Sequence, residues 1–182
     1  MKEYINKLLG KKFYIFGLGP SLKNIQEVES DAVKIGVNDI CRHFTPDYVV
    51  CIDKMRAFAP DRFKYIHECK VPVFTQYNKE HLPLLHQRVD IKLSNKRGII
   101  DLDAEDLSIS FCSPFVAAQI AYKMGASEIV FVGVDMNNHH LSSKMHELRV
   151  HFNHLKYALE NRGIKVTSAS DEEGALNSYE RF

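Results

Sequence analysis

The sequence predicts an α/β fold: a single Rossmann-like domain with a doubly wound, mostly parallel sheet and helices on both faces. Short apolar runs alternate along the 182 residues with segments of helical periodicity, which is typical of βαβ units. No repeat, low-complexity tract or linker composition divides the chain, so we expect one domain over residues 1–182. A chain of this length buries roughly 70% of its unfolded surface without disulfides or metals.

The expected strands are short runs rich in β-branched and aromatic residues, at 13–16, 33–37, 48–52, 71–74, 129–134 and 164–167. Helical patterns lie between them, at 21–28, 61–69, 79–86, 113–124 and 142–162. Gly125 and Gly163 follow the last residues of two of these helices. A C-terminal helix cap favours a residue that tolerates left-handed dihedrals, so both glycines support the helix boundaries.

Composition excludes several classes of protein. The net charge of +1 gives no global field that would attract nucleic acid or an anionic membrane. No apolar run approaches the roughly 20 residues of a membrane span, and the N-terminus lacks the apolar core of a signal peptide. We therefore expect a cytoplasmic protein with no membrane span and no nucleic-acid partner. The four cysteines lack CxxC spacing and are expected to be reduced and structural.

Doubly wound sheets bind ligands at the carboxyl ends of their strands, so the residues just after each expected strand are the first to inspect. Residues 17–21 read Gly-Leu-Gly-Pro-Ser. Gly17 and Gly19 permit a close approach of the backbone to a ligand, Pro20 suits a first helical turn, and Ser21 is placed to cap the helix that follows. The segment is either a phosphate or nucleotide site or a tight, well-capped βα turn.

Other polar residues stand at the same expected edge. Asn38 is the last residue of the run KIGVN. Its amide could hydrogen-bond a base or a ribose, or the residue could simply form a turn. Asp53 follows the third run. Ser113 begins a helix of small residues and could donate to a phosphate, and Asp135 follows an apolar strand, where it could hold a ribose hydroxyl or a cation.

Five of the nine histidines fall between positions 139 and 154. His146-Glu147 is followed by Arg149 and Val150, so the HExxH zinc motif fails and we expect no metal site. A histidine near a nucleotide site is better explained as a general base, because its ordinary pKa of about 6.5 suits proton abstraction at neutral pH. The alternative for each of them is a surface residue of a helix.

GLGPSLKNI resembles the GxGPSL turn of two related groups: the bacterial sialyltransferases of glycosyltransferase family 42, and the MptE-like family of 6-hydroxymethylpterin diphosphokinases and flagellin glycosylation proteins. The resemblance continues at Asn38 in KIGVND, and at Ser113 and Asp135 in CSPFVAAQIAYKMGASEIVFVGVDM. It implies a Rossmann-like fold that binds a cytidine monophosphate sugar without a metal. Counted back from the last expected strand, His146 falls where these sialyltransferases carry their catalytic histidine.

The chain departs from the sialyltransferase pattern at several positions. Leu18 stands where those enzymes have an asparagine, Cys112 replaces a threonine, and Pro114 replaces a glycine. Asn137 and Asn138 follow the GVD segment, where those enzymes supply a tyrosine that steadies the departing phosphate. Binding of a nucleotide is therefore better supported by the sequence than sialyl transfer itself.

The resemblance implies a nucleotide-dependent transferase, in the first reading a small, sialyltransferase-like glycosyltransferase that uses a nucleotide-activated sugar and needs no metal. His146 would be the general base, with Asn137 and Asp53 as additional site residues. The nucleotide would be bound by Gly17, Gly19, Pro20, Ser21, Asn38, Ser113 and Asp135. One alternative is a pyrophosphokinase whose Mg²⁺ is held by Asp53 and Asp135, and another is a nucleotide-binding protein without catalysis. The acceptor, a glycan or a small molecule, stays open, as does a homo-oligomer.

Overall fold

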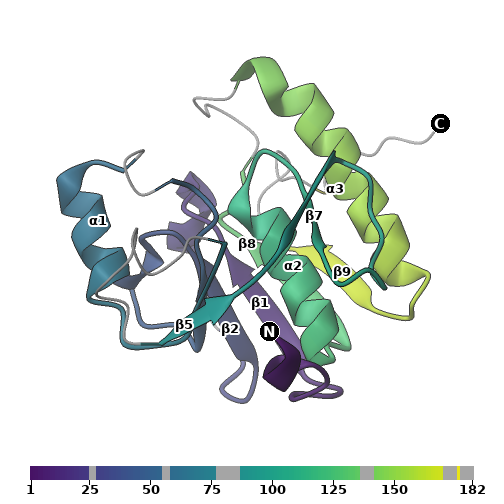
Figure 1. Ribbon diagram of the computed structural model, residues 1–182, viewed down its shortest axis with the longest axis horizontal. Coiled ribbons are helices and arrows are strands. Elements are labelled where there is room, and N and C mark those ends of the chain that lie inside the picture. The colour runs from purple at the N-terminus through teal and green to yellow at the C-terminus, as the bar shows by residue number, and fades with distance from the viewer. Residues whose placement is uncertain (25–27, 55–57, 77–86, 136–141, 170–175, 177–182) are drawn as a thin grey trace.

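The computed structural model describes residues 1–24, 28–54, 58–76, 87–135, 142–169 and 176, and it has the expected α/β architecture (Figure 1). Its central sheet has seven strands in the order β5-β4-β3-β2-β1-β8-β9, and every pair in it is parallel. The strands are β1 (Lys12–Phe16), β2 (Val33–Val37), β3 (Tyr48–Val50), β4 (Val73–Thr75), β5 (Arg88–Asp90), β8 (Glu128–Val132) and β9 (Lys165–Ser168). Strand order reverses at β1, which lies between β2 and β8.

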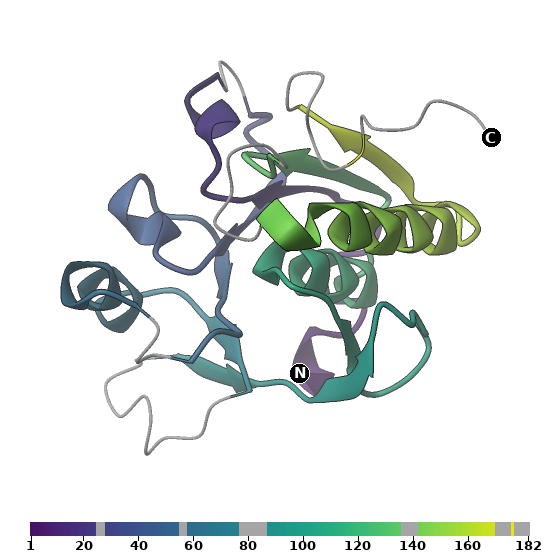
Figure 2. The ribbon, with the colours of Figure 1, turned by 90° about the horizontal axis from the view of Figure 1, so that it is seen from above.

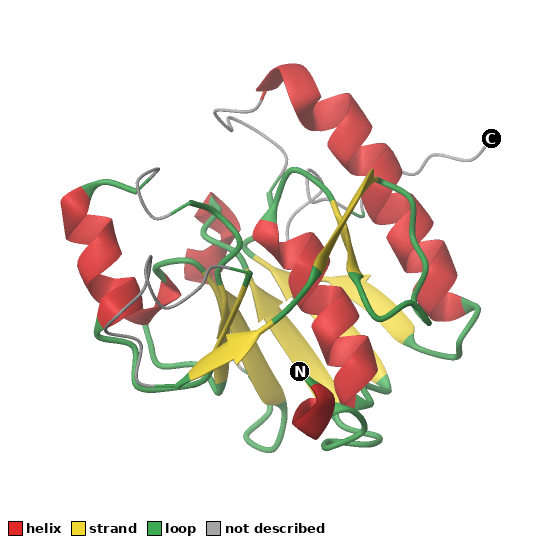
Figure 3. Cartoon of the chain, viewed as in Figure 1, coloured by secondary structure: helices red, strands yellow, loops and turns green. Residues whose placement is uncertain are grey.

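Helices cover both faces of this sheet, as Figure 3 shows. α2 (Ser113–Met124) and α3 (Met145–Glu160) pack on one face, where residues such as Phe115 and Phe152 share a core with β1 and β8. α1 (Pro60–His67) packs on the other face, where Ile66 joins a second core that includes Phe16. The doubly wound architecture predicted from the sequence is therefore confirmed.

A second, two-stranded sheet pairs β6 (Leu93–Arg97) with β7 (Leu107–Ile109). α2 contacts β7 as well as β1 and β2, and it is sandwiched between the two sheets in Figure 2. This position explains its small residues, because Ala117, Ala118 and Ala121 are fully buried and let the helix approach its neighbours closely.

The expected helix boundaries hold best for α2, whose bounds match the prediction and whose Gly125 has φ +98°. Gly163 is likewise left-handed, at φ +78°. The last expected helix instead begins as the 3₁₀ helix η5 (Ser142–Lys144) before α3. The expected helix at 79–86 lies outside the described residues.

The prediction of an α-helix at 21–28 is wrong in the described part of that segment. The chain there forms the 3₁₀ helix η2 (Pro20–Asn24), in which the Leu22 N–H donates to Gly19 O at 3.0 Å. Two more 3₁₀ helices, η1 (Lys2–Tyr4) and η3 (Ile40–Arg42), begin the chain and follow β2. The described part of the β1–β2 crossover is thus a tight turn, which leaves room beside it. None of the helices in the described ranges is long and apolar enough to cross a bilayer.

His151 on α3 is a core residue. Its side chain is about 10% exposed, its Nδ1 lies 2.9 Å from Ser110 Oγ, and its ring stacks on Phe111. Burial is the main cause that lowers the pKa of His151; Glu147 opposes this shift, and His154 and Arg97 add to it. The folded protein therefore favours the neutral imidazole.

We expect acid to destabilise the fold through His151. A histidine whose pKa is lowered by folding binds more protons in the unfolded state, so stability falls as the pH drops below its unfolded value of about 6.5. Urea unfolding at pH 7.5 and pH 5.5 measures the loss, and the variant His151→Gln, which keeps a polar side chain but cannot titrate, should lose less stability than the wild type. Equal losses in the two proteins would contradict this role.

Candidate functional site

The glycine turn after β1 lies against the end of β8. The Gly17 N–H donates to Val132 O at 2.7 Å, and the Gly19 N–H donates to Gly133 O at 2.8 Å. A Cβ on Gly17 would be 2.3 Å from Gly133 O, which is closer than side-chain carbons approach backbone oxygens. The turn therefore needs glycine for a close approach of two backbone segments, whatever ligand it also contacts.

Asp135 lies at the same turn. Its Oδ2 accepts a hydrogen bond of 2.8 Å from the Ser21 N–H, and a Cβ on Gly19 would be 2.3 Å from that oxygen. A carboxylate of the chain thus faces the start of η2, where the sequence predicted an anion. Ser21 is buried inside η2, not at the cap position before it, because the helix already begins at Pro20.

Three of the predicted residues meet around Asn38, at the carboxyl ends of β2 and β3. The Ser113 hydroxyl at the start of α2 donates to Asn38 Oδ1 at 3.2 Å, and Asn38 Nδ2 donates to Asp53 Oδ2 at 3.2 Å. Asn38 has φ +53°, a left-handed conformation that asparagine tolerates better than most residues. Both ends of its amide are therefore held at the edge where the ligand is expected.

The neighbouring Asp39 is a buried carboxylate that pairs with partly exposed arginines, and it was not among the predicted site residues. Asp39 is fully buried, and it accepts hydrogen bonds from Arg62 Nε at 3.0 Å and from Arg42 at 3.3 Å. Burial acts to raise the pKa of Asp39, but the hydrogen bonds and charge of Arg62, with a contribution from Arg42, outweigh it, so the pKa lies below its usual value. Because Arg62 lies near the start of α1, its ion pair with Asp39 connects this helix to the backbone next to Asn38.

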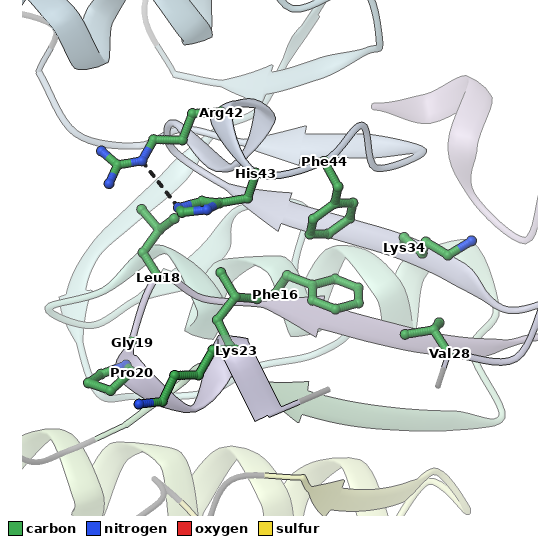
Figure 4. A pocket seen from close by; sticks show the side chains of 11 residues that line it. Phe16, Leu18, Gly19, Pro20, Lys23, Val28, Lys34, Arg42, His43 and Phe44 are labelled. Carbon is green, nitrogen blue, oxygen red and sulfur yellow. Dashed lines mark hydrogen bonds between the residues drawn. The ribbon is translucent and has the colours of Figure 1, made fainter. Parts of the chain in front are cut away.

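A pocket of about 540 Å³ opens between η2 and η3, on the face of the sheet opposite α2. Figure 4 shows Arg42, His43 and Phe44 along one side and Gly19, Pro20 and Lys23 along the other. Arg42 Nε donates to His43 Nε2 at 3.1 Å. The lining shares only Gly19 and Pro20 with the predicted nucleotide residues.

His146 is the second residue of α3 and is exposed. No hydrogen bond or ion pair within the described ranges joins it to the glycine turn or to Asn38. Asn137 lies outside the described residues. In that part of the chain, no three His, Cys, Asp or Glu side chains are grouped so that they could hold a metal ion.

A family model described as 6-hydroxymethylpterin diphosphokinase MptE-like matches residues 1–140. The chain belongs to the MptE-like family. The matched segment of this MptE-like protein contains the glycine turn, Asn38, Ser113 and Asp135 and ends before His146. The resemblance inferred from the sequence is thereby confirmed.

Sialyltransferases are among the solved structures similar to the MptE-like protein. One is the sialyltransferase CstII from Campylobacter jejuni in complex with a substrate analogue, cytidine-5'-monophosphate; it has a TM-score of 0.56 and 15% identity, over 90% of this chain and 81% of that chain. Another is CST-II in complex with trisaccharide acceptor and CMP, with a TM-score of 0.54 and 14% identity, over 94% of this chain and 89% of that chain. At these identities the likeness shows a shared fold. No curated protein matches the sequence.

The arrangement offers hydrogen-bonding groups in place of strong nucleophiles. Asn38 presents an amide, Ser113 a hydroxyl, and Asp53 and Asp135 two carboxylates, all near strand ends of one sheet. Amides and hydroxyls suit the base, ribose and phosphate of a nucleotide, and carboxylates suit ribose hydroxyls or a divalent cation. Asn38 joins two of these groups, because its amide bonds both Ser113 and Asp53.

Proposed function

We propose that this MptE-like protein is a nucleotide-dependent transferase that binds a cytidine monophosphate sugar across the carboxyl ends of β1, β2, β3 and β8. The observation that carries the proposal is the chain of hydrogen bonds from Ser113 through Asn38 to Asp53. It joins three predicted residues at the edge where doubly wound sheets bind their ligands. The complexes of the similar sialyltransferases with CMP support the choice of nucleotide.

In this proposal each residue of the edge has a role. Asn38 hydrogen-bonds the base or the ribose, Ser113 donates to the phosphate, and Asp135 accepts from a ribose hydroxyl. The turn of Gly17, Gly19, Pro20 and Ser21 forms the wall behind the phosphate. His146 takes the proton of the acceptor hydroxyl, and the oxygen of that hydroxyl forms a bond to the sugar carbon. The bond between this carbon and the phosphate oxygen breaks, and CMP leaves with the electron pair.

A second candidate is Mg²⁺-dependent pyrophosphoryl transfer from a nucleoside triphosphate, favoured by the description of the matching family. Mg²⁺ is commonly held by one or two carboxylates together with substrate phosphates. Asp53 and Asp135 are the candidate ligands for this ion, and each of them also accepts a hydrogen bond from the protein. Magnesium would neutralise charge on the transferred phosphates.

A thermal-shift panel of nucleotides with and without Mg²⁺ separates the candidates. Stabilisation by CMP in the presence of EDTA is the result expected for the sugar transferase. Stabilisation that requires both a triphosphate and Mg²⁺ favours pyrophosphoryl transfer, and the absence of any shift would contradict both. Binding of CMP without turnover of any CMP sugar identifies a non-catalytic nucleotide-binding protein.

The variant Asn38→Gly should weaken CMP binding by about 1 to 3 kcal/mol, because it leaves hydrogen-bonding groups of the ligand and of Ser113 without their partner. Glycine is chosen because it adopts the positive φ of Asn38 without strain, whereas alanine adds backbone strain. Isothermal titration calorimetry measures the difference.

Asn6→Gly is the matched control. Asn6 is also left-handed, at φ +55°, but it is exposed and its N–H bonds the Lys123 carbonyl, beside the end of α2 opposite Ser113. This variant should bind CMP like the wild type. If Asn38→Gly weakens all nucleotides equally, Asn38 does not read the base, and if it weakens none, the edge is not the binding site.

A further inference from the structure

The pocket between η2 and η3 has the size of a small-molecule site. Its volume of about 540 Å³ falls within the usual range of about 300 to 1,000 Å³ for such sites. It lies beside the described part of the β1–β2 crossover, where a 3₁₀ turn covers less of the sheet than a long helix would. The face of β1 that carries Phe16 therefore forms part of the pocket wall (Figure 4).

The apolar part of the pocket suits a ring. Phe16 and Phe44 meet edge to face, with ring centroids 4.7 Å apart. Three aliphatic side chains complete the apolar lining: Leu18, Leu22 and Val28. Such a surface favours a flat, apolar ring, because binding removes the ring from water.

The charged residues of the pocket that belong to the described ranges are of one sign. Lys23, Lys34 and Arg42 line it, and none of the described lining residues is Asp or Glu. Within the described part of the chain, Lys23 and Lys34 form no ion pair, whereas Arg42 shares its charge with Asp39. Because the whole chain has a net charge of only +1, three cations in one pocket are a local feature. An anionic ligand would find complementary charge there.

We propose that this pocket is a second ligand site, which binds a small amphipathic anion with an apolar ring and one phosphate or carboxylate group. The ring lies against Phe16 and Phe44, and the anion lies near Lys23, because Lys34 extends toward the opposite end of the pocket (Figure 4). The site is separate from the nucleotide edge, since Asn38, Asp53, Ser113 and Asp135 do not line it. It shares the wall formed by Gly19 and Pro20, so the two ligands would bind on either side of the glycine turn.

The test compares two probes that share a ring and differ in charge, 1-naphthyl phosphate and 1-naphthol, by calorimetry at low salt. We expect 1-naphthyl phosphate to bind with a dissociation constant about tenfold lower than that of 1-naphthol. The double variant Lys23→Gln/Lys34→Gln should remove most of that difference, since it removes two cations from the pocket and each contributes a few-fold at low ionic strength. Phe44→Ala should weaken both probes.

The matched control is Lys64→Gln/Lys96→Gln, which removes the same charge from α1 and β6, where both lysines are exposed and line no part of the pocket. It should bind both probes like the wild type. Equal affinity for the two probes, or an equal loss in the control, would overturn the proposal. So would displacement of 1-naphthyl phosphate by CMP in simple competition, because the probe would then occupy the nucleotide edge. Binding of the probe in a protein that fails to bind CMP supports this site and refutes only the proposed nucleotide function.

Discussion

Replacing His146 with alanine is expected to lower the turnover of a CMP sugar by about 10² to 10⁴, the range ascribed to a positioned general base. The affinity for CMP should change little, because the proton of the acceptor is transferred away from the nucleotide. Single-turnover kinetics with saturating donor measure the chemical step directly. The prediction rests on the resemblance to the sialyltransferases, which aligns His146 with their catalytic histidine, and the exposed side chain of His146 in the first turn of α3 is accessible to an acceptor.

His154→Ala is the control for this experiment. His154 is also exposed and lies on the same helix, farther from its start. His151 is unsuitable, because it is buried and lies 2.9 Å from Ser110, so its replacement by alanine would also change stability. If His146→Ala turns over at the wild-type rate, another group is the base. His43, which lines the pocket beside η3, is then the next histidine to replace.

Gly17→Ala should destabilise the protein by about 3 kcal/mol, the upper end of the usual cost of forcing a side chain into a packed site. The new Cβ would lie 2.3 Å from Gly133 O, a backbone atom that cannot rotate away. Separation of β1 from the end of β8 would also break the hydrogen bond from Gly19 to Gly133. We therefore expect CMP binding to be lost together with stability, as measured by urea unfolding and calorimetry.

Gly10→Ala separates crowding from backbone strain. Gly10 has φ +75°, but a Cβ there would meet no atom within 4 Å, so its replacement should cost only about 1 kcal/mol of backbone strain. Gly17 does not have a left-handed φ, and its expected loss is therefore due to crowding alone. Similar losses in the two variants would show that the turn tolerates a side chain.

The elements of the fold that could be predicted are those with a clear local pattern in the sequence. The expected boundaries of α2 are correct because its apolar face, the proline in its first turn and Gly125 all lie within one segment. Three strands were not predicted, since each is short and carries polar residues: β5 (Arg88–Asp90), β6 (Leu93–Arg97) and β7 (Leu107–Ile109). Such strands form because partners such as Val73 and Leu107, distant in the chain, offer hydrogen bonds.

The candidate site was likewise predictable only where its residues have a local signal in the sequence. Asn38, Asp53 and Ser113 could be selected because each stands at the end of a strand or the start of a helix, where the topology brings ligand-binding residues together. The pairing of Asp39 with Arg62 could not be foreseen, because it depends on how α1 packs beside η3. The close contact of Gly17 with Gly133 likewise depends on the order of strands in the sheet.

The place of β1 in the sheet has a consequence for synthesis on the ribosome. Phe13 pairs with Val33 on one side and with Ile129 on the other. At about 5 to 20 residues per second, several seconds pass between the emergence of β2 and that of β8. During this interval one edge of β1 has no neighbour from β8, and an apolar strand edge of this kind can pair with another nascent chain. The glycine turn, which hydrogen-bonds to Val132 and Gly133, takes its final shape only after the greater part of the polypeptide has been made.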